Sequence, residues 1–298
     1  MKIAVIVFLF LSLNTFGQIL PTDSVLSEKK LAIIAGTETV VTVGSLSYLA
    51  TAWYSDYEHS PFHFFNDLNE WQGMDKIGHM TTSYFCGKIG YDLMRFTGLN
   101  EKKSNIYGGG IGLAYLTIVE VFDGFSEEWG FSGYDYLFNS AGTLLFVGQN
   151  YFFHDQRIKL KYSFHSSGLE KYRPNLLGEN LAQNFIKDYN GQTYWASINI
   201  GSFLSKENKF PSWLNLAVGY GAEGMIGSFS NPAKYKGQIM PVLKRSNQLY
   251  LSLDIDFTKM KIKNKSLKSL VEILSFIKFP MPAVEFGNQG TKFYPIYF

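Results

Sequence analysis

Three apolar segments of this chain each carry a pair of polar side chains at helical spacing. The members of each pair are three or four residues apart, so they share one face of a helix. The pairs are Asp75 and His79, Glu120 and Asp123, and Asp135 and Asn139. Burying a carboxylate without a partner costs several kcal/mol. We therefore expect three helices of one bundle to bring these side chains together at a shared interior point.

Two neighbouring polar residues, Lys76 and Ser132, extend these pairs to a candidate cluster of eight. The cluster comprises Asp75, Lys76, His79, Glu120, Asp123, Ser132, Asp135 and Asn139. A histidine among carboxylates is suitable ligand chemistry for a divalent metal, and it also suits general acid–base work. We assign no cofactor and no catalytic residue from the sequence, and keep a divalent metal as the alternative.

A purely structural explanation of the same residues stays open. Ser132 is placed to cap a helix, and Asp135, three residues later, gives that helix an acidic first turn. Asp75 and Lys76 then form a surface pair. A structural polar network, a ligand-binding or metal-binding site and a catalytic site are thus three interpretations of one pattern.

The N-terminus is typical of a secretory signal peptide. A single positive charge at Lys2 precedes an apolar run from Ile3 to Leu13. This run is shorter than the roughly 20 residues that a membrane-spanning helix needs. We predict that residues 1–17 form the signal peptide. The single cysteine, Cys86, lies far from this point and is expected to be a small apolar core residue.

Charge is distributed unequally between the two halves of the chain. Residues 19–155 hold 7 Lys and Arg against 16 Asp and Glu, whereas residues 170–298 hold 16 against 9. Aromatic residues make up 17% of the chain, which suits contact with a lipid interface. We predict membrane lipid or outer-membrane components as partners and exclude nucleic acid, because no nucleic-acid-binding motif is present. The sequence assigns no oligomeric state.

The fold class that the patterns predict is α+β. Residues 18–158 are expected to form a hydrophobic bundle of about four helices, near Leu31–Tyr54, Asp75–Phe96, Asn105–Phe122 and Tyr134–Phe153. Glu38 makes a lipid-facing span of the first helix unfavourable. Gly108 and Gly112, four residues apart in the third, predict close approach of helix backbones rather than dinucleotide binding.

Residues 159–298 are expected to form a smaller, basic, antiparallel β-containing region with an amphipathic helix. Period-two alternation predicts strands near Tyr194–Ile200, Leu214–Tyr220 and Leu249–Phe257, with helices near Leu176–Lys187 and Lys265–Lys278. An Asn-Gly turn at Asn190 precedes the first of these strands. The four or five strand candidates are fewer than the roughly eight that a closed single-chain barrel needs.

The ordered polar positions resemble a known family. The order is Asp75-Lys76 and His79, then Glu120 and Asp123, then Ser132, Asp135, Asn139 and Gly142. It resembles the YfiM-like predicted periplasmic lipoproteins, a domain family of unknown function, and more distantly the VanZ-like membrane proteins. The resemblance covers residues 74–146 and implies an envelope location and a helical fold, but no reaction. The lipidation cysteine of that family is absent here, and the basic C-terminal half lies outside the resemblance.

Taken together, the patterns predict an exported protein of a Gram-negative-type envelope, located in the outer membrane or the periplasm. We expect a structural or interaction role at the outer membrane, facing the periplasm, and lean against an enzyme. The alternative is a membrane-embedded binding or hydrolytic site for a lipid-linked or metal-bound ligand at the His/carboxylate cluster.

Overall fold

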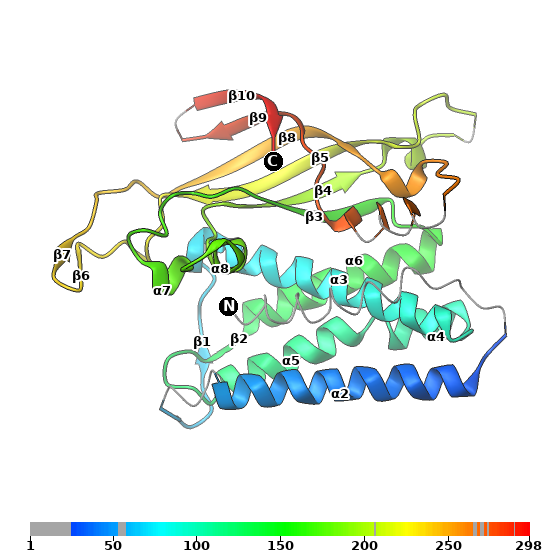
Figure 1. Ribbon diagram of the computed structural model, residues 1–298, viewed down its shortest axis with the longest axis horizontal. Coiled ribbons are helices and arrows are strands. Elements are labelled where there is room, and N and C mark those ends of the chain that lie inside the picture. Colours follow the sequence, from blue (N-terminus) through cyan, green and yellow to red (C-terminus); the bar gives the residue numbers. More distant parts are fainter. Residues whose placement is uncertain are drawn as a thin grey trace. The chain divides into compact units, whose positions relative to one another are not determined.

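The computed structural model describes residues 25–52, 58–205, 207–264, 267–268, 271–272, 274–288 and 290–298. The predicted signal peptide, residues 1–17, lies outside the described residues. The chain divides into two compact units. The sheet unit comprises Asn69–Ile77 and Arg157–Phe298, and the helical unit comprises the described residues up to Leu68 together with Gly78–Gln156. Helices combined with an antiparallel sheet confirm the α+β class (Figure 1).

The helical unit is built from long helices and two short strands. Its elements are α2 (Glu28–Ala52), β1 (Phe64–Phe65), α3 (Met74–Phe96, whose first residues belong to the sheet unit), α4 (Glu101–Tyr107), α5 (Ile111–Asp123), β2 (Phe131–Ser132) and α6 (Gly133–Phe153). The predicted bounds of α3 and α6 agree with the structure to within a residue. A core that includes Cys86, Leu93, Tyr115 and Leu116 packs between these helices, and Cys86 is buried as expected.

The predicted third helix, Asn105–Phe122, is wrong as one element. The structure ends α4 at Tyr107 and starts α5 at Ile111, with a turn at residues 108–110 between them. The glycines serve close packing, as expected. A Cβ on Gly108 would lie 2.3 Å from the backbone oxygen of Gly90, and a Cβ on Gly90 would lie 2.4 Å from that of Gly108. Glycine at both positions therefore allows the backbone of α3 to approach the turn after α4 this closely.

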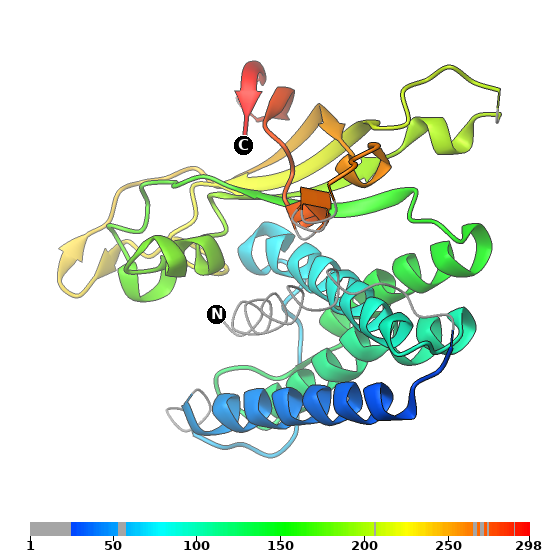
Figure 2. The same ribbon diagram turned by 45° about the vertical axis from the view of Figure 1, so that its right-hand side comes forward.

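Two helical stretches are long and apolar enough, by length and composition alone, to cross a membrane. They are Glu28–Ala50 and Glu101–Asp123. Core helices of soluble proteins can be equally long and apolar, so length and composition alone do not show that either stretch crosses a membrane. Most of α2 is exposed, and its Ser45 hydroxyl accepts a hydrogen bond of 2.9 Å from Tyr115 of α5. Figure 2 shows α2 running alongside α5.

The sheet unit is organised around a six-stranded antiparallel sheet with the order β10-β9-β8-β5-β4-β3. The strands are β3 (Ile158–Phe164), β4 (Gln192–Ile198), β5 (Leu214–Glu223), β8 (Ser246–Ile255), β9 (Met281–Gly287) and β10 (Gly290–Tyr297). Short elements complete the unit: η2 (Glu70–Gly73), α7 (Pro174–Leu177), α8 (Leu181–Lys187), η3 (Ile200–Phe203), β6 (Lys234–Tyr235), β7 (Gln238–Ile239), η4 (Phe257–Lys259) and η5 (Leu274–Phe276).

The three strands predicted from alternation are confirmed as β4, β5 and β8, and the turn at Asn190 precedes β4. Strands β3, β9 and β10 were not predicted. The predicted helix Leu176–Lys187 is divided into α7 and α8 at Gly178, whose φ of 114° ends the first. The predicted helix Lys265–Lys278 falls partly outside the described residues. Within it, residues 267–268 and 271–272 are helical and η5 follows.

Candidate functional site

His79, on the second turn of α3, is the centre of the candidate site. Its Nδ1 atom lies 3.1 Å from Oδ1 of Asn139 and 3.9 Å from Oε1 of Glu120, and its Nε2 atom lies 3.7 Å from Oδ1 of Asp135. All four side chains are buried. Helices α3, α5 and α6 therefore each bring a polar group to one point, as the helical spacing predicts.

Ser132 connects this point to a residue that sequence reasoning missed. Its hydroxyl caps α6 by accepting a hydrogen bond of 3.0 Å from the backbone N–H of Asp135, and donates one of 2.5 Å to Oδ1 of Asp67. Its own backbone N–H lies 3.3 Å from Oε2 of Glu120. Asp67 follows β1, and the parallel pairing of Phe65 with Ser132 holds the two strands side by side. Asp67 lies in a loop, so helical spacing cannot identify it as a site residue. The one sequence signal near it is the aromatic stretch that precedes it.

A polar ladder joins α3 to α6 beside the site. One turn beyond His79 and Asn139, Ser83 Oγ lies 2.8 Å from Thr143 Oγ1. Asn139 has no exposed surface. Its Nδ2 atom has no hydrogen-bond acceptor among the described residues. An unsatisfied buried donor costs about 1–3 kcal/mol, so this amide points to an oxygen that the described chain does not supply.

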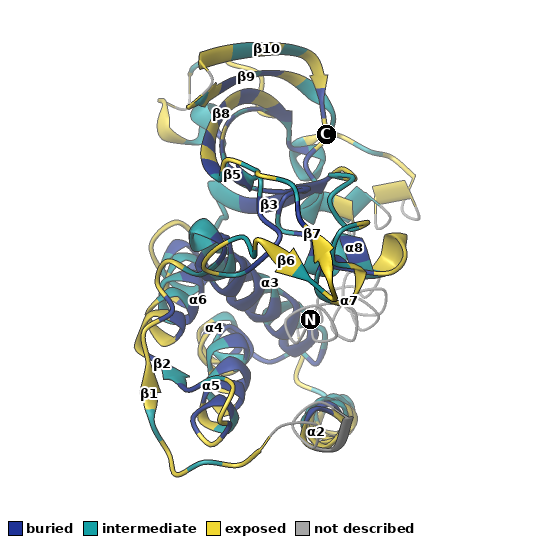
Figure 3. Ribbon diagram, turned by 90° about the vertical axis from the view of Figure 1, so that its left-hand side faces the viewer, coloured by how far each residue is buried: buried dark blue, intermediate teal, exposed yellow. Residues whose placement is uncertain are grey.

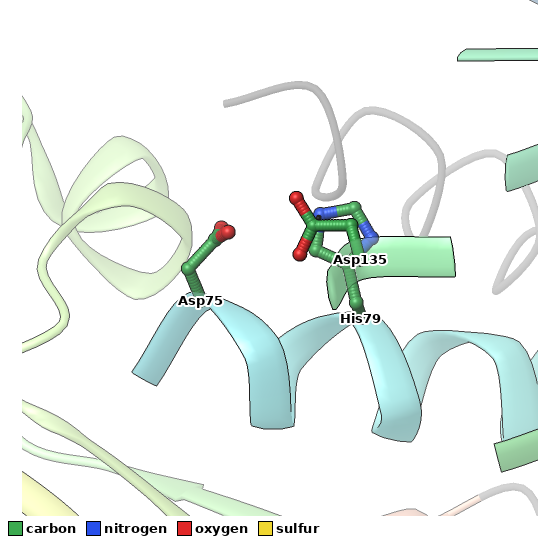
Figure 4. Close-up of side chains that lie close together, drawn as sticks. All are labelled: Asp75, His79 and Asp135. Atoms are coloured by element: carbon green, nitrogen blue, oxygen red, sulfur yellow. Dashed lines mark ion pairs between the residues drawn. The ribbon is translucent and has the colours of Figure 1, made fainter. Parts of the chain in front are cut away.

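Asp75 lies one turn before His79, and Figure 4 shows the two side chains on the same side of α3. Within the sheet unit, the Asp75 carboxylate accepts hydrogen bonds of 2.9 Å from Lys76 Nζ and 2.7 Å from the Tyr189 hydroxyl. Burial, reinforced by the nearby Asp75 charge, raises the pKa of Tyr189 well above its ordinary value. Tyr189 thus stays protonated and keeps donating. Lys76 is itself buried, so the expected surface pair of Asp75 and Lys76 is wrong.

The remaining candidate, Asp123, is the buried last residue of α5. Its backbone carbonyl accepts a hydrogen bond of 3.0 Å from the N–H of Ser126. The contacts given above connect His79, Glu120, Ser132, Asp135 and Asn139 directly. Asp75 and Lys76 form a second pair at the start of the same helix.

The geometry around His79 is suitable for two kinds of chemistry. With Asn139 Oδ1 as the acceptor, Nδ1 carries the ring proton and the lone pair of a neutral imidazole is on Nε2, towards Asp135. Nε2 and the Asp135 carboxylate are then suitable ligand atoms for one metal ion. If both nitrogens are protonated instead, an imidazolium lies between the carboxylates of Glu120 and Asp135 and stabilises the helix packing.

The comparisons with known proteins concern the part of the chain that holds this site. No curated protein and no solved structure matches the chain. Residues 63–150 match one family model, a stretch that includes every candidate residue from Asp75 to Asn139 as well as Asp67. The description of that family names a location and no activity. Over these residues the chain is similar to the predicted periplasmic lipoprotein family (DUF2279), which supports an exported, periplasm-facing envelope protein.

Proposed function

We propose that this chain is a non-enzymatic protein of the outer membrane whose periplasm-facing helical unit binds a divalent metal ion. The ligands are Nε2 of His79 and the carboxylate of Asp135. The observation that carries the proposal is the 3.7 Å separation between Nε2 and Oδ1. Nitrogen and carboxylate ligands stand about 2.0–2.2 Å from a zinc ion, so two ligands of one ion are about 3–4 Å apart.

The other ring nitrogen supports the same assignment. A metal-binding histidine usually donates its second N–H to a carboxylate or carbonyl, which fixes the tautomer and the orientation of the ring. Asn139 Oδ1 at 3.1 Å and Glu120 Oε1 at 3.9 Å occupy that position for His79. The Nδ2 atom of Asn139 would then donate to a further ligand of the ion, such as a bound water molecule.

Charge favours a divalent cation over a protonated histidine alone. Asp67, Glu120 and Asp135 are buried carboxylates connected by the contacts of Ser132 and His79. A doubly charged ion offsets more of the repulsion among carboxylates than an imidazolium does. The role that follows is structural, because the ion links α3 to α6.

Calorimetric titration tests the metal proposal. The full-length chain, purified in detergent and freed of metal by chelation, is titrated with zinc and with manganese, and its thermal unfolding is followed with and without each ion. We expect one ion to bind and to raise the unfolding temperature, with about 2.7 kcal/mol of stabilisation at a free concentration of about 100 times Kd. His79→Gln and Asp135→Asn should abolish both effects.

Two matched variants separate a lost ligand from a damaged fold. Asp123→Asn removes another buried carboxylate of the helical unit, and His154→Gln removes an exposed histidine paired with Glu101. Both should bind the ion as the parent does. The proposal fails if the parent chain binds neither ion, or if His79→Gln binds with unchanged affinity. If His79→Gln does not fold, the titration of the parent chain with zinc and manganese alone decides whether the chain binds a metal ion.

Separation of membranes by density tests the proposed location. Outer and inner membranes and the periplasmic fluid of cells that produce the tagged chain are compared by immunoblot. We expect the chain in the outer-membrane fraction; the family description supports a periplasm-facing location. Recovery from the inner membrane or the fluid phase would contradict the outer-membrane role but leave the metal proposal untouched. The likeness to YfiM-like and VanZ-like proteins in particular stays a prediction.

A further inference from the structure

Strand β8 of the six-stranded sheet directs most of its polar side chains inward and its leucines outward. Along β8 the burial alternates strictly: Gln248, Tyr250, Ser252 and Asp254 are buried, whereas the leucines between them are exposed. Figure 3 shows this alternation on β8, β9 and β10, which curve strongly. A sheet that faces water on one side normally shows the reverse pattern, with apolar residues towards the core.

The exposed apolar residues form one continuous face, because the strand register aligns them. We call this the outer face. It pairs Val218 with Leu251, Leu251 with the half-buried Val284, and Leu249 with Phe286. Phe293 of β10 continues the row next to Val284. The exposed members used here are Val218, Leu249, Leu251, Leu253, Phe286 and Phe293.

The inner face of the same sheet carries hydrogen-bonded polar groups beside a buried, mainly aromatic cluster of Trp195, Ala217, Tyr250, Ala283 and Tyr297. Ser197 donates a hydrogen bond of 2.6 Å to Asp254 and accepts one of 2.9 Å from Asn215. On β9 and β10, Tyr294 donates to Glu285 at 2.7 Å, and Lys292 lies 3.3 Å from the same carboxylate. These polar side chains of the strands therefore find their hydrogen-bond partners on the inner face.

We propose that the outer face of β8, β9 and β10 contacts the acyl chains of a lipid bilayer. Strands that face lipid alternate apolar-out and polar-in, and the outward positions of β8 from Leu249 to Leu253 are all apolar and exposed. A protein partner would need only a local apolar patch, whereas an apolar solvent selects every outward position of a strand. The exposure is substantial: 54% for Leu249, 48% for Phe286 and 65% for Phe293.

Strand length agrees with this environment, and the β3 edge of the sheet is partly covered, whereas the described residues pair no strand with the other edge, β10. β5 and β8 have 10 residues each, which at about 3.4 Å per residue spans about 34 Å, compared with a hydrocarbon thickness of about 30 Å. The edge of β3 is covered in part, because Lys278 N–H donates to the Tyr162 carbonyl at 2.9 Å and Ile277 forms a bridge beside it. Unpaired strand edges are costly in lipid.

Quenching by brominated lipid tests the proposal. Single substitutions Leu251→Cys and Phe286→Cys on the outer face are labelled with a fluorescent maleimide in the full-length chain. Burial raises the pKa of the Cys86 thiol to about 12, so the native cysteine stays unlabelled at neutral pH. The protein is reconstituted into vesicles of phosphatidylethanolamine and phosphatidylglycerol, with or without bromine on the acyl chains.

We expect strong loss of fluorescence from both outer-face labels in brominated vesicles. Val242→Cys is the matched control, since Val242 is an apolar, fully exposed residue of the sheet unit that lies between β7 and β8. Its label should keep its fluorescence. Equal quenching at all three positions, or no quenching at Leu251 and Phe286, overturns the proposal. Protection of the outer-face labels by a second copy, seen as concentration-dependent dimers, also overturns it.

Discussion

The Nζ atom of Lys161 on β3 lies 2.6 Å from Oδ2 of Asp254 on β8, and both side chains are almost completely buried. Lys161 also donates to the Ile255 carbonyl at 3.0 Å, and Ser197 donates to the same Asp254 oxygen. The inner face of the sheet therefore contains a fully desolvated ion pair with additional hydrogen bonds. Removing only one partner of such a pair is strongly destabilising, because the other charge stays buried without compensation.

Asp254→Ala should lower the free energy of unfolding by about 3–5 kcal/mol, because it leaves the Lys161 ammonium buried without its carboxylate. Urea unfolding followed by circular dichroism measures the change. Asp92→Ala is the control, since it breaks a partly exposed pair with Lys88 and should cost less than about 1 kcal/mol. Equal losses of unfolding free energy for Asp254→Ala and Asp92→Ala would contradict the assignment of Lys161 and Asp254 as a buried ion pair. Replacing Lys161 and Asp254 together by Met and Leu should recover most of the loss.

Lys278 should make stability depend on pH in the alkaline range. Its burial lowers the pKa of the ammonium to about 8, although Asp254 opposes the shift. Above about pH 8 the unfolded chain therefore binds more protons at this lysine than the folded chain does. Because of this difference, the free energy of unfolding rises with pH from about 8 up to the pKa of the lysine in the unfolded chain. Below about pH 8 the full penalty of the buried charge is present.

Chemical denaturation at about pH 7.5 and about pH 9.5 isolates this contribution, since Tyr side chains titrate mainly at higher pH. The parent chain should gain up to about 1–2 kcal/mol over this interval relative to Lys278→Met, at about 1.4 kcal/mol per pH unit. An identical pH dependence for the two chains would show that Lys278 keeps an ordinary pKa.

The helical half of the fold and the centre of the candidate site were predictable because their signals are local. Spacings of three and four residues identify which side chains share a helix face, and the cost of burying charge identifies which faces must meet. Asp67 was missed because it lies on a loop and reaches Ser132 through the pairing of β1 with β2. Sequence spacing carries no information on such a contact.

The sheet was less predictable because alternation does not say which face is inside. The leucines of β8 identify a strand but are exposed, whereas Ser246, Gln248, Ser252 and Asp254 are buried. In β3 the lysines at the inward positions hide the pattern of a core strand. Strands β9 and β10 contain Pro282 and Pro295, and proline is rare in the interior of a sheet; both prolines are exposed near the edge of the sheet.

Ser132→Ala should destabilise the helical unit by about 1–2 kcal/mol, because it removes the cap of α6 and the hydrogen-bond donor to Asp67. Unfolding free energy from urea titration checks this. Ser140→Ala on the same helix removes only an exposed hydroxyl that donates to the Tyr136 carbonyl, and a change within about 0.5 kcal/mol is expected. Ser132→Asp restores a capping acceptor but adds a charge beside Asp67, so it should not rescue stability.

Two glycines of α6 should respond in opposite directions to replacement by alanine. A Cβ on Gly142 would lie 2.0 Å from the Met80 carbonyl oxygen of α3, whereas a Cβ on Gly148 meets nothing within 4 Å. Gly142→Ala must push α6 away from α3 and should cost about 1–3 kcal/mol or more. Gly148→Ala should gain about 0.5–1 kcal/mol, because alanine is the better helix former. Thermal unfolding measures both.

The same pair of variants links helix packing to the proposed metal ion. His79 and Asp135 lie on the two helices that Gly142 holds in contact, so separating the helices should widen the distance between Nε2 and the carboxylate. Gly142→Ala is therefore expected to weaken zinc binding in the calorimetric titration, and Gly148→Ala to leave it unchanged. If Gly142→Ala destabilises the chain but binds zinc as tightly as the parent, the ion is held by residues other than His79 and Asp135.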